Sequence, residues 1–106
     1  MTENAKIPPN YQAVMPYLIL KNACGFIDFA VEVFNAKPGY VAKSDQQTIV
    51  HAEIMIGVST IMIAESSEIF GEKPAGLFVY VDLADVAYGK ALKAGATVLT
   101  PNAPIE

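Results

Sequence analysis

The sequence predicts an α+β protein in which a strand–helix–strand unit occurs twice. Short apolar runs of strand length alternate with amphipathic helical segments along the chain. A shift of 60 positions places residues 17–21 over residues 77–81, and it also superposes the two predicted helices. The helix ends coincide as well, because Asn35 falls on Gly95, and both residues tolerate a positive φ. This offset indicates an internal duplication. The alternative is an α+β sandwich with two similar crossovers and no duplication.

The first unit begins with a short strand and a helix. Residues 17–21 form the strand, since Leu-Ile-Leu is a continuous apolar run. Asn22 is a suitable N-cap for a helix over residues 23–34, which carries an apolar stripe. Asn35 predicts a left-handed stop, and Pro38 followed by glycine prevents continuation.

Three further strands complete this unit. We expect them over residues 40–43, 51–56 and 60–65, with Gly57-Val58 as the turn of an antiparallel hairpin between the last two. Alternation within residues 51–56 divides the side chains between two faces. One face carries His51, Glu53 and Met55, and the other carries Ala52, Ile54 and Ile56.

The second unit follows a polar linker over residues 66–76. We expect a strand over residues 77–82, and a helix over residues 86–94 with Asp85 as its N-cap and Gly95 as its stop. A last strand is expected over residues 97–100. The chain is thus divided into a flexible arm (1–13), a first module (14–70) and a partial second module (77–106), within a single domain.

Composition excludes several classes of protein. The chain has 106 residues, 53% of them hydrophobic and 17% charged, with a net charge of −4. It has no basic stripe for nucleic acid and no apolar run long enough for a membrane. Cys24 is the sole cysteine, which we expect to be a small buried residue, and no signal peptide is visible. We therefore expect a soluble, cytoplasmic protein. The apolar surplus predicts a homodimer.

The order and spacing of six segments resemble a known family. Together they are similar to the PhnB-like branch of the glyoxalase/bleomycin-resistance (vicinal oxygen chelate) superfamily. The segments are residues 15–23, 34–36, 51–57, 61–65, 77–82 and 93–98. The resemblance implies two βαβββ modules side by side, with sheets that curve around a cavity. In that pattern the second module lacks two strands here, so we expect a longer chain or a partner subunit to complete it.

The resemblance also implies where a metal would be bound. Members of the superfamily that use a metal take a ligand from the first and last strand of each module. The corresponding positions are Met15, Gly76 and Glu65, with the fourth beyond residue 106. Because only Glu65 can bind a hard cation, we predict no metal and no other cofactor.

Two groups of side chains are candidates for a ligand site. His51 and Glu53 share a strand face, and an imidazole beside a carboxylate forms a possible acid–base pair. The alternative is a polar, solvated strand edge. Glu65 is a candidate polar anchor, or else an exposed strand end.

The second group is aromatic. Phe78 and Tyr80 share a strand face that Tyr17 can oppose. These rings could form an aromatic wall against which a planar ligand stacks. The alternative is that they pack in the core or in a dimer interface. Three functions stay open at this point: metal-free binding of an unidentified small molecule, a metal-dependent lyase, isomerase or dioxygenase completed by other strands, and a non-catalytic scaffold.

Overall fold

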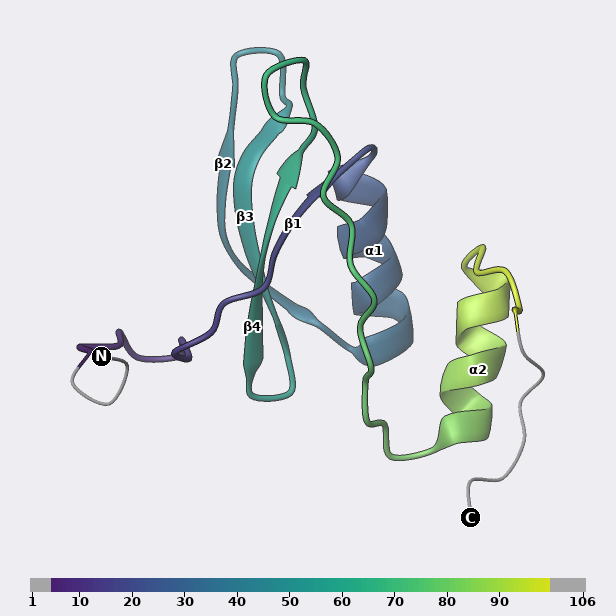
Figure 1. Ribbon diagram of the computed structural model, residues 1–106. Helices are drawn as coiled ribbons and strands as arrows, with labels where there is room; N and C mark the ends of the chain where they lie inside the picture. Colours follow the sequence, from purple (N-terminus) through teal and green to yellow (C-terminus); the bar gives the residue numbers. More distant parts are fainter. Residues whose placement is uncertain (1–4, 100–106) are drawn as a thin grey trace.

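The computed structural model describes residues 5–99 and contains one βαβββ unit followed by a second helix (Figure 1). The elements are β1 (Tyr17–Leu20), α1 (Ala23–Phe34), β2 (Lys37–Lys43), β3 (Ile49–Ile56), β4 (Ser59–Glu65) and α2 (Ala84–Lys93). The four strands form one open mixed sheet in the order β1-β4-β3-β2. β1 is parallel to β4, whereas β3 is antiparallel to both β2 and β4. The predicted α+β class is confirmed.

The core lies between α1 and one face of the sheet (Figure 1). Ala23, Ile27 and Ala30 of α1 are buried against β3 and β4, where Ile54 and Ile63 are fully enclosed. Each enclosed isoleucine contributes about 1.5–3 kcal/mol by removal of its side chain from water. The packing leaves the opposite face of the sheet without a helix among the described residues.

Helix α1 has the predicted bounds, and asparagines flank both ends. Asn22 is left-handed (φ 61°), and its side chain accepts a hydrogen bond from the N–H of Gly25 at 3.0 Å. A Cβ on Gly25 would lie 2.3 Å from the Asn22 side chain, so this position favours glycine. Asn35 is also left-handed (φ 56°), which confirms the predicted stop.

The predicted strand over residues 40–43 is too short. β2 begins at Lys37 and includes Pro38-Gly39, which we expected only to end the helix. β2 is an edge strand, with a neighbouring strand on one side only, and edge strands are where a proline is tolerated in a sheet. The pairing with β3 shifts register between Pro38 and Val41. The hairpin of β3 and β4 is confirmed, with Gly57 at φ 60° in its turn.

The second unit differs from the prediction. Of the elements expected there, only the helix forms in the described residues. Residues 77–82 and 97–99 form no strand, and residue 100 lies outside the described part of the chain. A strand requires a partner for its backbone groups, and the free edge of β1 is already bridged by Lys73 to Ile19. α2 begins at Ala84 and packs beside α1. Asp85 therefore lies in its first turn and not at the N-cap, which is Leu83.

Much apolar surface stays exposed in the described chain. The radius of gyration is 15.3 Å, whereas a compact domain of this length has about 13 Å. Exposed large side chains include Val58, Ile69, Phe70, Tyr80 and Leu99. Cys24 is exposed as well, which corrects the expected burial, because it falls on the outer side of α1. No helix within residues 5–99 has both the length and the hydropathy needed to cross a bilayer.

Candidate functional site

The face of the sheet opposite α1, which we call the open face, carries the polar side chains at the centre of the sheet. Along β3, His51 and Glu53 point to this face while Ala52 and Ile54 are buried against α1, as alternation predicted. Glu53 pairs with Met62 of β4, and Met62 pairs with Tyr17 of β1. The register therefore brings Tyr17, His51 and Glu53 onto one face.

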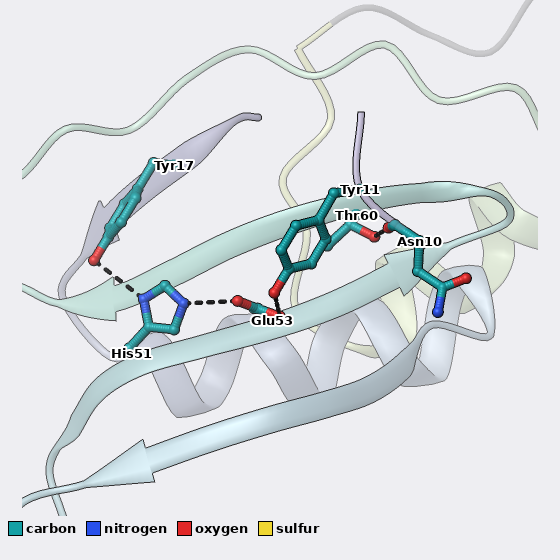
Figure 2. A network of polar contacts seen from close by, with 6 residues as sticks. All are labelled: Asn10, Tyr11, Tyr17, His51, Glu53 and Thr60. Atoms are coloured by element: carbon teal, nitrogen blue, oxygen red, sulfur yellow. Dashed lines mark hydrogen bonds and ion pairs between the residues drawn. The ribbon is translucent and has the colours of Figure 1, made fainter. Parts of the chain in front are cut away.

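A chain of polar contacts runs across this face (Figure 2). His51 Nε2 lies 2.9 Å from Glu53 Oε2, and the hydroxyl of Tyr11 donates to Glu53 Oε1 at 2.5 Å. The Tyr17 hydroxyl lies 3.4 Å from His51 Nδ1, and the two rings meet edge-on with centroids 5.6 Å apart. The predicted His51–Glu53 pair is thus formed, and the Glu53 side chain is only 13% exposed.

The charge of this network is set by Glu53. The hydrogen bonds from Tyr11 and then from His51 lower the pKa of the Glu53 carboxyl below its usual value. The same carboxylate raises the pKa of the Tyr11 phenol, because deprotonation would break its hydrogen bond and add a second negative charge. An ionised carboxylate only accepts, so His51 must donate through Nε2. With a neutral imidazole, Nδ1 is then free to accept from Tyr17, and the network carries one negative charge.

Asn10 and Gln12 of the N-terminal arm, which was predicted over residues 1–13, are hydrogen-bonded to Thr60 at this face. The Gln12 side chain donates to the Thr60 carbonyl at 2.7 Å and accepts from the Thr60 N–H at 3.3 Å. The Thr60 hydroxyl donates to the carbonyl of Asn10 (Figure 2). Residues 1–4 of the predicted arm lie outside the described part of the chain.

Two cavities lie on the open face, one at each end of the polar network. The first, which we call the apolar cavity, has a volume of about 580 Å³. It is lined by Tyr17, Ile19, Thr48, Ile49, Val50, Ala64, Glu65, Ser66, Ser67, Phe70 and Lys73. The second, the arm cavity, has a volume of about 340 Å³ between the arm and the sheet. It is lined by Pro8, Pro9, Asn10, Tyr11, Gly39, Tyr40, Glu53, Met55 and Thr60.

Glu65 has a structural role beside the apolar cavity. Its two carboxylate oxygens accept from the backbone N–H groups of Asn22 at 2.9 Å and Ala23 at 2.8 Å. A carboxylate at this point satisfies free amides at the start of α1 and interacts favourably with the helix dipole. Within residues 5–99, no three side chains of His, Cys, Asp or Glu gather as metal ligands would.

The predicted aromatic wall is divided between two places. Phe78 and Tyr80 contact each other, with ring centroids 5.3 Å apart, and both are largely exposed. They line a separate cavity beside Pro16 and the turn at Gly57. Tyr17 instead packs against His51 on the open face.

Sequence reasoning missed the contribution of the arm. Tyr11 and Gln12 reach partners 42 and 48 positions away, and no local pattern indicates such contacts. The sole signal was the presence of an aromatic and an amide side chain in a segment otherwise typical of a linker.

Comparison with known proteins gives one informative similarity. No protein family matches the sequence, and no curated protein matches it. Among solved structures, the chain is similar to TioX from Micromonospora sp. ML1, with a TM-score of 0.60. The sequences are 20% identical over 83% of this chain and 76% of TioX. At this identity the similarity concerns the fold alone.

Proposed function

We propose that this protein binds a small, largely apolar molecule on the open face of its sheet without the help of a metal ion. The observation that carries the proposal is the apolar cavity of about 580 Å³, a size typical of ligand pockets. Its walls are mainly aliphatic and aromatic, with Ile19, Val50 and Phe70 among them. Burial of a ligand against these side chains supplies the affinity.

A few polar groups at the rim would orient the ligand. Tyr17 lines the cavity and contacts His51, so its hydroxyl can exchange that long contact of 3.4 Å for a ligand. Lys73, which is bridged to Ile19 at the edge of β1, also lines the cavity, and its positive charge favours an acidic substituent. Glu65 also lines the cavity, but its oxygens are occupied by the start of α1. Tyr17 and Lys73 would therefore make the polar contacts that orient the ligand.

A hydrophobic dye provides a direct test. Anilinonaphthalene sulfonate combines an apolar ring system with one negative charge, which suits the apolar cavity and Lys73. We expect saturable binding, with a fluorescence increase and a higher melting temperature. Val50→Glu should abolish both signals because it places a charge in the cavity, whereas Val58→Glu, at a 92% exposed side chain outside it, should leave them intact. Equal binding by both variants would refute the assignment.

The proposal includes the paired arrangement of βαβββ modules and a homodimer. One βαβββ unit is present in the described residues, and its open face and exposed apolar side chains are suited to a second copy of the chain. Light scattering of the purified protein should give twice the mass of one chain. A monomer across the accessible concentration range would contradict this part of the proposal.

A second candidate function, acid–base catalysis, is favoured by the 2.9 Å contact between His51 and Glu53. A carboxylate on Nε2 orients the imidazole, and a fixed orientation is what a general base requires. The free nitrogen, Nδ1, faces Tyr17 beside the apolar cavity. On any substrate found by screening, His51→Ala should remove turnover while His51→Gln retains ligand binding. Unchanged turnover in both variants would exclude the imidazole from the reaction.

A further inference from the structure

We propose that the arm cavity is a second binding site, specific for a small organic cation such as a quaternary ammonium group. The inference is independent of the proposed function, because this cavity lies between the N-terminal arm and the sheet, apart from the apolar cavity. It rests on the kinds of side chain that surround it and on the charge at its base.

The walls offer the surfaces that an alkylammonium group prefers. Two phenol rings, Tyr11 from the arm and Tyr40 from β2, line the cavity together with Pro9 and the thioether of Met55. The face of an aromatic ring is electron-rich and attracts a cation, while the methyl groups of a quaternary ammonium pack against the apolar atoms. Tyr40 is held on this side of the sheet by its ring contact with His51, at a centroid distance of 6.1 Å.

The charge of the cavity has the required sign. Glu53 is the one charged side chain among the residues that line it. Both of its oxygens already accept one hydrogen bond, from Tyr11 and His51, but each keeps a further lone pair. A quaternary ammonium needs no hydrogen bond, so it can be attracted by the carboxylate without displacing either partner. An anion would meet the same carboxylate with no lysine or arginine in the lining to offset it.

Tyr11 couples the ligand to the arm. Its hydroxyl fixes the carboxylate at 2.5 Å, and its ring forms a wall of the cavity. The Gln12–Thr60 pair holds the arm at the same end of the sheet. A cation in this cavity would therefore contact the arm and the sheet together, and it should stabilise their association.

Choline is the probe, and its uncharged analogue with carbon in place of nitrogen is the control. Titrations at constant ionic strength are followed by the methyl resonance of Met55 in the full chain. We expect saturable binding of choline and roughly tenfold or more weaker binding of the analogue. Equal affinity for the two molecules, or no saturable response to choline, would overturn the proposal.

Two pairs of variants separate the charge from the ring. Glu53→Gln should weaken choline binding by roughly tenfold, whereas Glu68→Gln, at an exposed position outside the cavity, should not. Tyr40→Leu keeps an apolar side chain at a 63% exposed position and should weaken binding roughly 2- to 30-fold. Tyr80→Leu is its matched control. If Tyr40→Leu and Tyr80→Leu bind choline with the same affinity, the Tyr40 ring does not contact the bound cation.

Discussion

Removal of the Glu65 carboxylate should destabilise the fold, because this side chain holds the start of α1. Glu65→Ala deletes two charge-assisted hydrogen bonds, of 2.9 Å to Asn22 and 2.8 Å to Ala23. Asn22 is exposed, so water can replace the lost acceptor there, but Ala23 is fully buried. An amide left without a partner costs about 1–3 kcal/mol, and the lost charge at the helix start costs about 0.3–1 kcal/mol. The sum predicts a loss of about 1.3–4 kcal/mol.

Denaturant unfolding followed by circular dichroism measures this loss directly. Glu65→Gln keeps one carbonyl oxygen and should lose about 1 kcal/mol, because one acceptor survives without the charge. Glu68→Ala is the matched control, since Glu68 is exposed, and it should change stability by less than about 0.5 kcal/mol. If Glu65→Ala were no more destabilising than Glu68→Ala, the carboxylate would not be holding the start of α1, and the reasoning would fail.

Other perturbations follow from the same geometry. Tyr11→Phe should raise the pKa of Glu53 toward its ordinary value, measured by NMR titration, since the Tyr11 hydrogen bond is the largest cause of its lowering. Because the folded-state pKa is depressed, the stability linked to Glu53 is present above the unfolded-state pKa and is lost as the pH falls through the folded-state pKa. Gly57→Ala, at φ 60°, should destabilise by about 1 kcal/mol, whereas Gly89→Ala within α2 should stabilise by about 0.5–1 kcal/mol in urea unfolding. Ile63→Ala should cost about 2–5 kcal/mol in the same assay because the side chain is fully buried.

Each of these expectations has a clear contrary result. An unchanged pKa of Glu53 in Tyr11→Phe would mean that the arm does not reach the sheet in solution. A stabilising effect of Gly57→Ala would contradict the left-handed turn. A loss below about 1 kcal/mol for Ile63→Ala would show that this side chain is not enclosed by α1.

The first unit could be predicted from the sequence because its signals are local. Asn22 and Asn35 mark the ends of α1 through backbone conformations that asparagine tolerates, and alternation along β3 sorts His51 and Glu53 from Ile54. The pairing of those two polar side chains followed from their spacing alone. Local pattern was therefore sufficient for α1 and β3, although it placed the start of β2 too late and Cys24 in the core.

The remainder depends on contacts that no local pattern encodes. Residues 77–82 have strand composition, yet a strand forms only where another backbone can pair with it. The attachment of Tyr11 and Gln12 to the sheet, and of Glu65 to the start of α1, joins positions more than 40 residues apart. These are the contacts that convert a face of a sheet into a candidate site.

The parallel pairing of β1 with β4 has a consequence for synthesis of the chain on the ribosome. β1 gains its neighbour, and α1 its anionic cap, only after residue 65 has left the exit tunnel. Until then the nascent segment exposes the apolar stripe of α1 and an unpaired first strand. Closure of the loop between the two strands is the late, entropically costly step. Native structure in this unit should therefore appear abruptly once Glu65 emerges, and not element by element as translation proceeds.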